Sequence, residues 1–449
     1  MRASRHVHQP EETMKKRLAF ALAVIASTSI AGIARSATIT IATVNNKDMI
    51  IMQRLTPKWE KATGNKVNWV VLEENVLRQR ATTDISTQAG SFDVVTIGAY
   101  ETAIWGKNGW LTPLNDFGSS YDYGDILKPV RDGLSIGGNL YAVPFYAESS
   151  FTIYRKDIFA KAGLTMPDRP TWAQIGQLAD KLTDRSSGQY GICLRGKPGW
   201  GENMGLITTM ANTFGGRWFD MQWKPQLTSN PWRKAIGFYA SLLRRDGPPG
   251  ASSNGFNENE ALFATGHCAI WVDATSAAGR LYDTATSKVA DDLAFASAPT
   301  AATPKGAAWF WAWSLAIPKT TKNEATAKAF VKWATSREYV ALVAASDGWV
   351  AAPPGTRKST YDSADYQKAA PFAKMTLDAI MTVDPAHPTM LPVPYQGIQY
   401  VAIPQFQGIG TLVGQDIAGV VSGTSSVTSA LGAAQRSTTQ AMIKANYLH

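Results

Sequence analysis

Cysteine and histidine are scarce in this chain, which has 2 Cys and 5 His among 449 residues. His6 and His8 lie close to the N-terminus, and His267, His387 and His449 are far apart in the sequence. A zinc site takes several Cys and His ligands at short spacings, and these residues form no such pattern. We therefore expect neither a metal site nor a cofactor.

Clustered positive charge is also missing, although the formal net charge is +9. Residues 1–37 hold 6 of the basic residues and 2 of the acidic ones, which leaves 38 Lys and Arg against 33 Asp and Glu in the rest of the chain. These are spread out, with no run of basic residues that could follow a phosphate backbone. We expect no binding to nucleic acid.

Long apolar runs are absent after the N-terminal segment, which argues against a protein with several membrane spans. The composition is 45% hydrophobic and only 18% charged, so the chain can bury a large core and is not disordered. A length of 449 residues exceeds that of one ordinary domain and predicts two or three of them.

The first 36 residues have the pattern of a signal peptide. Met14 is followed by the basic stretch Lys15–Arg17, by apolar residues 18–33 and by small residues that permit cleavage before Ala37. We predict that residues 1–36 are removed, that Met14 is the true start, and that the mature protein is periplasmic. A membrane anchor is the alternative, but an apolar stretch of about 16 residues is short for a span.

Export makes a disulfide between the two cysteines plausible, because an oxidising compartment preserves such bonds. Cys193 and Cys268 are the only available pair. We predict that they form a disulfide, with two buried free thiols as the alternative.

Residues 38–97 predict alternating strands and helices. Thr38–Val44 alternates with a period of two, and apolar residues then recur at helical spacing. The predicted order is strand 38–44, helix 51–63, strand 67–72, helix 76–88 and strand 92–97. Such an order gives a parallel sheet with flanking helices, and ligands bind beyond the carboxyl ends of its strands. Asn45, Asp48 and Tyr100 are candidates on this ground.

The sequence has 15 tryptophans, all between residues 59 and 349. Indole rings pack flat on C–H groups and offer an N–H donor, which suits a sugar or polyol. Trp309, Trp311 and Trp313 would share one face of a strand over residues 307–317. We assign Trp309 and Trp311 to ligand contact, and Trp313 to the core.

Polar groups gather in two further segments. Residues 193–203 read as a Gly- and Pro-rich loop that presents Arg195, Trp200 and Glu202, although a solvated surface loop would look similar. An apolar strand over residues 269–272 has Asp273 at its end. We expect the carboxylate of Asp273 to bind hydroxyl groups of the ligand, with an N-cap of the following helix as the alternative. By contrast, the G-x-S-x-G pattern around Ser135 lacks the strand and helix of a nucleophile elbow.

Together these features resemble the extracellular solute-binding proteins of ABC importers, family 1, and most closely the sorbitol/mannitol type. The resemblance covers essentially the whole mature chain and is carried by Val44–Asn46 with Asp48, Tyr146–Glu148, Ile153–Asp157, Leu194–Asn203, Gly266, Cys268–Asp273, Ala308–Pro318 and Pro394–Tyr400. It implies an α/β fold with two lobes, joined by hinge strands, that close on a ligand in the cleft between them. No reaction occurs in that family, and the closed form docks on a membrane permease.

The resemblance also implies a discontinuous division of the chain. Residues 37–144 and 281–336 would form lobe one, and residues 145–280 and 337–449 lobe two. The extended apolar pattern of residues 139–154 independently predicts a segment that crosses between lobes. The ligand-binding residues it implies are Asn45, Asp48, Tyr100, Glu148, Arg195, Trp200, Asp273, Trp309, Trp311 and Tyr395. The expected partners are a polyol (sorbitol, mannitol or arabitol) or a related sugar and the permease subunits, and the protein is expected to be a monomer.

Two other functions fit part of the pattern. A secreted glycoside hydrolase would also combine aromatic residues with a carboxylate pair, which Glu148, Glu202 and Asp273 could supply. A binder of a peptide, a metal chelate or an osmolyte could use the same scaffold, with aromatic rings and acidic groups around a cation.

Overall fold

The computed structural model describes residues 36–448. The predicted signal peptide lies almost entirely outside the described residues. Strand β1 covers Thr38–Val44, as predicted, and helix α2 follows at Lys47–Thr63. Asn46 caps α2 by accepting a hydrogen bond from the backbone N–H of Met49. Gly64 ends the helix with a φ of 75°, a conformation that glycine adopts without strain.

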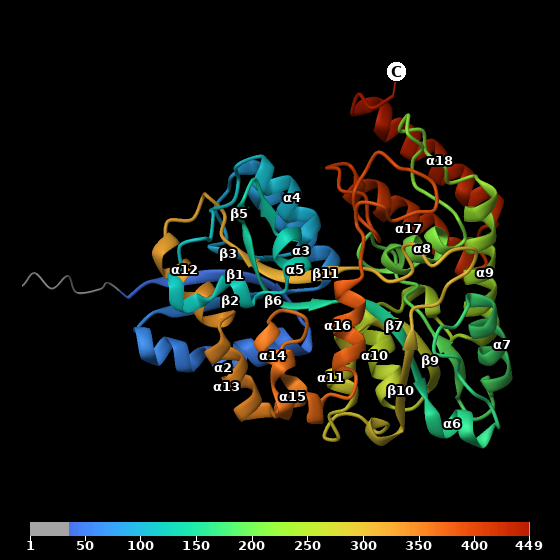
Figure 1. Cartoon of the computed structure of the whole chain (residues 1–449). Helices are drawn as coiled ribbons and strands as arrows, with labels where there is room; N and C mark the ends of the chain where they lie inside the picture. Colours follow the sequence, from blue (N-terminus) through green and yellow to red (C-terminus); the bar gives the residue numbers. More distant parts are fainter. Residues whose placement is uncertain (1–35, 449) are drawn as a thin grey trace, which may run out of the picture. The chain divides into compact units, whose positions relative to one another are not determined.

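A five-stranded sheet is built on β1, in the order β2-β1-β3-β11-β6. Strands β1, β2 and β3 run parallel, which confirms the α/β prediction, whereas β11 is antiparallel to both β3 and β6. Helices lie on both faces: in Figure 1, α2 and α13 are below the sheet and α3 and α4 above it. The bounds are β2 Lys66–Leu72, α3 Glu74–Thr87, β3 Val94–Ile97, α4 Ala99–Lys107, β6 Ala142–Glu148, β11 Trp311–Ala316 and α13 Arg337–Asp347.

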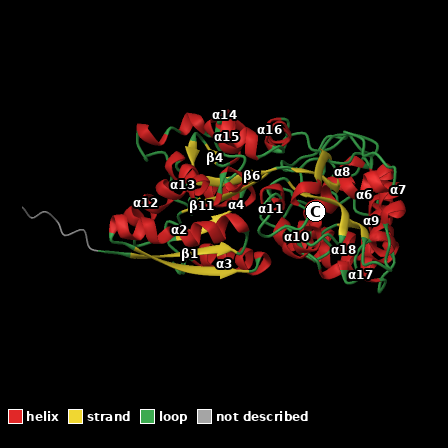
Figure 2. Cartoon of the chain, turned by 90° about the horizontal axis from the view of Figure 1, so that it is seen from below, coloured by secondary structure: helices red, strands yellow, loops and turns green. Residues whose placement is uncertain are grey.

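A second sheet has four strands in the order β10-β7-β9-β8. Strand β8 is parallel to β9, and the other neighbours are antiparallel. Helices α9, α17 and α18 pack against one another in this part of the chain (Figure 2). The bounds are β7 Ser150–Arg155, β8 Tyr190–Cys193, β9 Cys268–Ala274, β10 Leu293–Ser297, α9 Asn230–Asp246, α17 Phe406–Ser422 and α18 Val427–Lys444.

The chain crosses from one sheet to the other at Ser149. Strand β6 ends at Glu148 in the five-stranded sheet, and β7 begins at Ser150 in the four-stranded sheet (Figure 1). A crossing within residues 139–154 was predicted from the extended apolar pattern. Pro144 is tolerated inside β6 because this strand lies at the edge of its sheet.

Two elements, β10 and α13, do not lie beside the sheet that the predicted division gives them; α13 lies below the five-stranded sheet although residues 337–449 were assigned to lobe two (Figure 1). Residues 281–336 were assigned to lobe one, yet β10 pairs with β7 in the four-stranded sheet, with Phe295 opposite Ile153. The chain returns to the five-stranded sheet only at β11. An alternation read along one sequence does not reveal which sheet a short strand joins, because that depends on its pairing partner. The boundaries of the lobes remain a prediction.

The other helices surround these sheets, and from α12 to residue 448 the chain is helical with connecting turns. Thr171 caps α7, since its hydroxyl accepts from the N–H of Gln174. The bounds of these other helices are α5 Lys128–Gly133, α6 Lys156–Lys161, α7 Trp172–Leu182, α8 Asn203–Thr213, α10 Phe256–Ala264, α11 Ala277–Leu281, α12 Glu324–Ala334, α14 Lys358–Asp362, α15 Ala364–Ala369 and α16 Ala373–Met381. A short hairpin joins β4 Ser135–Ile136 to β5 Asn139–Leu140. Among residues 36–448, no helix combines the length and hydropathy needed to cross a membrane.

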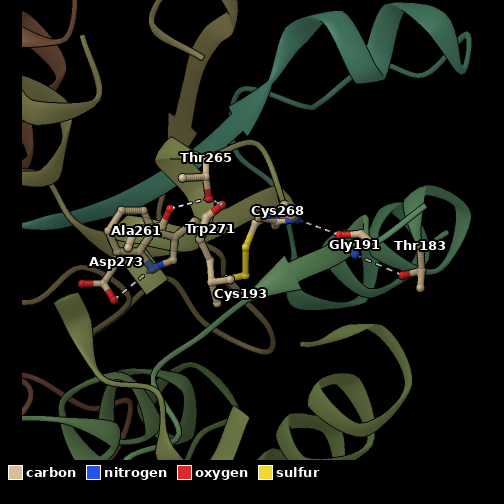
Figure 3. The surroundings of a disulfide bond; sticks show 11 residues. Thr183, Gly191, Cys193, Ala261, Thr265, Cys268, Trp271 and Asp273 are labelled. Carbon is tan, nitrogen blue, oxygen red and sulfur yellow. Dashed lines mark hydrogen bonds between the residues drawn. A yellow bond between two sulfur atoms is a disulfide. The ribbon is translucent and has the colours of Figure 1, made fainter. Parts of the chain in front are cut away.

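Cys193 and Cys268 are joined by a disulfide, with their Cα atoms 5.9 Å apart. The bond ties the end of β8 to the start of β9, and Trp271 and Asp273 lie farther along β9 (Figure 3). In the register of the two strands, Cys193 stands opposite Trp271. The disulfide therefore fixes the strand pair that leads, two residues beyond Cys193, to Arg195.

Candidate functional site

A cavity of about 950 Å³, including the solvent space at its mouth, is lined by strands of the five-stranded sheet, by α3, and by loop and helix residues that lie before and after the strands of the four-stranded sheet. Its size is that of a small-molecule site. It brings together six of the residues proposed from the sequence: Asn45, Glu148, Arg195, Trp200, Trp309 and Trp311. They come from the end of β1, the end of β6, the loop before α8 and the start of β11.

Trp309 is held at the crossing between the sheets. The Oγ of Ser149 donates to the carbonyl of Trp309 at 2.7 Å, and the N–H of Trp309 donates to the Oγ of Ser150 at 3.1 Å. Thr275 closes the arrangement, because its N–H donates to the carbonyl of Ser149 at 2.9 Å. The cavity wall is thus fixed to the residue where the chain changes sheets.

Trp311 and Trp313 alternate on β11 and both line the cavity, with their ring centroids 5.6 Å apart. Trp313 was assigned to the core; it is 5% exposed, but it also faces the cavity. Gly98 lets Trp311 lie where it does, because a Cβ at this position would come 2.0 Å from Cζ2 of the indole. The close approach of backbone to ring therefore requires glycine.

Three residues that line the cavity, Trp200, Trp309 and Trp311, have an indole N–H group for which residues 36–448 provide no hydrogen-bond acceptor. The side chains belong to residues that are 3–5% exposed. A buried donor without an acceptor costs free energy. An acceptor brought within reach of these N–H groups would remove this cost.

Glu148 places a carboxyl group in the same cavity, at the end of β6. Ser276 Oγ donates to its Oε2 at 2.5 Å. Burial raises the pKa of Glu148 to about 8, an effect that outweighs the hydrogen bond from Ser276 and the charge of Arg195. Near neutral pH this carboxyl group is mostly protonated and can donate as well as accept a hydrogen bond.

Arg195 is bound tightly by Asp273. Its Nε lies 2.9 Å from Asp273 Oδ2 and its Nη2 2.7 Å from Oδ1, a bidentate pair. Burial alone would lower the pKa of Arg195, but the charge and the hydrogen bonds of Asp273, together with the charges of Glu202 and Glu74, outweigh burial and hold this pKa above its usual range. Glu202 lies farther off, with its Oε2 3.6 Å from Arg195 Nη1. Burial and the charge of Glu74 raise the pKa of Glu202 to about 7.

Arg78, on α3, also lies in the cavity wall. Its Nη1 donates to Glu101 Oε1 at 2.8 Å and its Nη2 to Glu74 Oε1 at 2.8 Å. Burial opposes the charge on Arg78, but the charges of Glu74 and Glu101 more than offset this and raise its pKa.

Four proposed residues do not line the cavity. Asp273 is fully buried behind Arg195, within β9 rather than at its end or as an N-cap. Tyr100 supports Trp200 from behind, with ring centroids 4.6 Å apart. Asp48 lies beside a second, smaller cavity, where burial raises its pKa to about 6. Tyr395 accepts from the N–H of Trp218 in an aromatic cluster away from the cavity.

The cavity also has lining residues that the sequence analysis did not assign to the ligand. Arg78 and Glu74 carried no signal, because charged residues on a helix usually face solvent. Tyr146 and Asn46 did carry one, through the resemblance; Asn46 Nδ2 donates to the hydroxyl of Tyr146 at 2.8 Å. Further lining residues are Leu72, Glu73, Lys197, Glu202, Phe256, Ser276, Trp313 and Gln399.

Comparison with known proteins gives close relatives. A mannitol-binding protein of Pseudomonas aeruginosa is 57% identical over 411 residues, which cover 91% of this chain and 94% of the relative. The crystal structure of an ABC transporter solute-binding protein from Agrobacterium vitis S4, with bound D-mannitol, superposes with a TM-score of 0.91 at 57% identity, covering 92% of this chain and 99% of the other.

A more distant structure shares the fold. An ABC transporter solute-binding protein from Agrobacterium radiobacter K84, in complex with ribitol, superposes with a TM-score of 0.80 at 24% identity, covering 90% of this chain and 98% of the other. These relatives are binding proteins, and they give the glycoside hydrolase alternative no support. A profile of the family described as bacterial extracellular solute-binding protein matches residues 45–341. The chain therefore belongs to the bacterial extracellular solute-binding proteins.

Proposed function

We propose that this protein captures a polyol, with D-mannitol as the first candidate, and delivers it to the permease of an ABC importer from the periplasm. The observation that carries the proposal is the set of three unpaired indole donors in one cavity. A signal peptide over residues 1–36 and a monomeric state are part of the proposal. The mannitol-binding relatives, at 57% identity, favour this ligand over other polyols.

The chemistry of the cavity matches a chain of hydroxyl groups. The indole N–H groups of Trp200, Trp309 and Trp311 need acceptors, and each hydroxyl oxygen offers lone pairs. The carboxyl groups of Glu148 and Glu202 can accept hydrogen bonds from ligand hydroxyl groups in return. The faces of the indole rings pack on the C–H groups of the carbon chain. A neutral, flexible ligand with a hydroxyl on every carbon would satisfy all of these groups.

Ligand capture is proposed to stabilise a closed arrangement of two lobes, one around each sheet. Two contacts support this, because they join α3 beside the five-stranded sheet to the loop before α8. Lys197 Nζ lies 2.8 Å from Glu73 Oε1, and Asn75 Nδ2 donates to the carbonyl of Pro198 at 3.2 Å. A ligand that bridges both sides adds to these contacts and shifts the population towards closure.

Catalysis is not part of the proposal. Of the three carboxylates considered for a glycosidase pair, Asp273 is committed to Arg195 and has no exposed surface. Since the relatives at 57% identity are binding proteins, we expect no turnover on incubation with chromogenic glycosides. Turnover that the substitution Glu148→Gln abolishes would contradict the proposal.

Thermal unfolding of the mature chain, from Ala37 on, tests the ligand. The panel holds D-mannitol, D-sorbitol, D-arabitol, ribitol, monosaccharides, disaccharides and betaine. A ligand at about a thousand times its Kd adds about 4 kcal/mol to the free energy of unfolding. We expect the largest rise in Tm with D-mannitol. Stabilisation by cyclic sugars alone would overturn the polyol assignment, and no stabilisation by any of them would overturn the proposal.

A further inference from the structure

Arg78 is enclosed by three tryptophan rings. Its guanidinium carbon lies 4.1 Å from the ring centroid of Trp200, 4.8 Å from that of Trp311 and 5.0 Å from that of Trp313. Trp200 belongs to the loop before α8, whereas the other two lie on β11. We call these three rings the tryptophan cage. Segments far apart in the sequence thus converge on one cation.

Acidic groups complete the surroundings of this cation. Glu101 and Glu74 each accept from the guanidinium at 2.8 Å, and the Arg78 side chain is only 5% exposed. Aromatic faces with carboxylates at their edge are the arrangement that recognises organic cations such as quaternary ammonium ligands. In this protein the cation is supplied by the chain itself.

We propose that Arg78 is a specificity-determining residue: it occupies the tryptophan cage as a resident cation, so that the cavity accepts uncharged polyols and refuses organic cations. The proposal rests on the proposed function for the identity of the ligand. Without Arg78, the cage would offer three aromatic faces and two uncompensated carboxylates to a cationic ligand. With Arg78 in place, a second cation would meet charge repulsion and find the rings already covered.

The geometry explains why this residue is an arginine. The planar guanidinium can stack on rings while it donates in its own plane to Glu74 and Glu101. A lysine would keep the charge but would present a compact ammonium that cannot do both. The indole N–H groups of Trp200 and Trp311 remain unpaired beside this cation. The guanidinium of Arg78 therefore contacts the rings of Trp200 and Trp311 and positions the two indole N–H groups that are proposed to bind the ligand.

Chemical rescue of Arg78→Ala tests the proposal, with methylguanidinium chloride as the probe. We expect the variant to bind D-mannitol about tenfold more weakly or worse by calorimetry. Millimolar methylguanidinium should restore most of this affinity and should raise the Tm of the variant even without mannitol. The same concentration of sodium chloride should do neither, and methylguanidinium should leave the wild-type protein unchanged.

Arg357 supplies a matched control. It is also buried, with Nη1 3.1 Å from Asp125 Oδ2 and its guanidinium carbon 4.7 Å from the ring centroid of Tyr121, but it is not among the residues that line the cavity. Arg357→Ala should lower the Tm and leave the mannitol affinity unchanged. If Arg78→Ala does not fold, the double variant Arg78→Ala/Glu101→Gln removes the buried unpaired charge and takes its place in the same assay.

Two results would overturn the proposal. In the first, the variant folds and binds mannitol as the wild type does. In the second, the variant loses mannitol affinity, and methylguanidinium neither restores this affinity nor raises the Tm of the variant. Failure of the proposed function gives a different pattern. In that case no form of the protein binds mannitol, yet methylguanidinium still stabilises Arg78→Ala and not the wild type, which would leave the resident-cation assignment standing.

Discussion

Ser276 Oγ donates a hydrogen bond of 2.5 Å to Glu148 Oε2, which joins the end of β6 to the residue that precedes α11. Ser276 lines both the large cavity and the smaller one beside Asp48. Glu148 is therefore positioned from the side of the four-stranded sheet while it belongs to the five-stranded sheet. Its protonation depends on burial, and this makes the pH dependence of the protein informative.

Glu148→Gln should change how the stability of the unliganded protein depends on pH. Burial raises the pKa of Glu148 from 4.5 to about 8, so the folded protein keeps a proton that the unfolded chain loses between these values. The free energy of unfolding therefore falls as pH rises through this window, by about 1.4 kcal/mol for each pH unit at most. The variant should lose the contribution of Glu148 to this slope, while those of Glu202 and Asp48 stay, and it should have the higher Tm above pH 8.

The control for this experiment is Glu324→Gln, a glutamate of α12 whose side chain is 52% exposed. It should leave the slope as it is. Thermal unfolding across this pH range is the measurement. An identical slope in Glu148→Gln and wild type would contradict the assignment of the buried proton to Glu148.

Trp311→Phe keeps an aromatic face and removes one unpaired N–H donor. We expect mannitol binding to weaken by about 1 kcal/mol or more, the contribution of a hydrogen bond, with little change in the Tm without ligand. Trp172→Phe is the control, because the Trp172 N–H also lacks an acceptor but does not line the cavity. Equal mannitol affinities of Trp311→Phe and wild type, measured by calorimetry, would remove this donor from the site.

Gly98→Ala should act on the ligand through Trp311. The new Cβ would lie 2.0 Å from Cζ2 and 2.2 Å from Cη2 of the indole, so the ring must move. We expect weaker mannitol binding than in wild type. In the background Trp311→Phe, which lacks these two atoms, the same change should cost less affinity. Additive losses in this double-mutant cycle would contradict the proposed route. Gly237→Ala, in α9 with open space around its Cα, is the control.

Replacing both cysteines, as Cys193→Ala/Cys268→Ala, should destabilise the protein. The bond closes a loop over a sequence separation of 75, for which chain entropy gives a loss of about 4 kcal/mol. Urea unfolding measures it. Because Arg195 lies two residues beyond Cys193, mannitol affinity should fall as well. Alkylation of two thiols in the native wild-type protein would contradict the presence of the bond.

Asn75→Ala should weaken binding without touching the ligand. Asn75 is not among the residues that line the cavity, but its Nδ2 donates to the carbonyl of Pro198 on the other side of its mouth. Loss of this contact should favour opening and raise the dissociation rate of mannitol a few-fold, with a smaller effect on association. Gln79→Ala, an exposed residue of the same helix, is the control for stopped-flow fluorescence. An unchanged dissociation rate would show that the contact between Asn75 and Pro198 does not stabilise the closed arrangement.

Local patterns predicted the elements well where one residue type has one structural role. The alternation in Thr38–Val44 gave β1 at its observed bounds. The tryptophans of β11 were found in the same way, because alternation places Trp311 and Trp313 on one side of a strand. These inferences depend only on residues close together in the sequence, and the order of such residues is known before the fold is.

Side chains whose role depends on distant partners were harder to predict. Arg195 and Asp273 were both assigned to the ligand, but Asp273 neutralises Arg195 and lies behind it. Arg78 gave no signal, since only the packing of α3 against β11 surrounds it with rings. A sequence shows that residues of opposite charge are present, but not which of them form ion pairs with each other.

The hydrogen bonds of Trp309 with Ser149 and Ser150 bear on the proposed closure. They tie one wall of the cavity to the point where the chain passes from one sheet to the other. In a rotation about this point, a residue is displaced in proportion to its distance from the axis, so Trp309 would stay nearly in place while α3 and the loop before α8 move farther. A ligand that contacts Trp309 would therefore keep that contact in both the open and the closed arrangement.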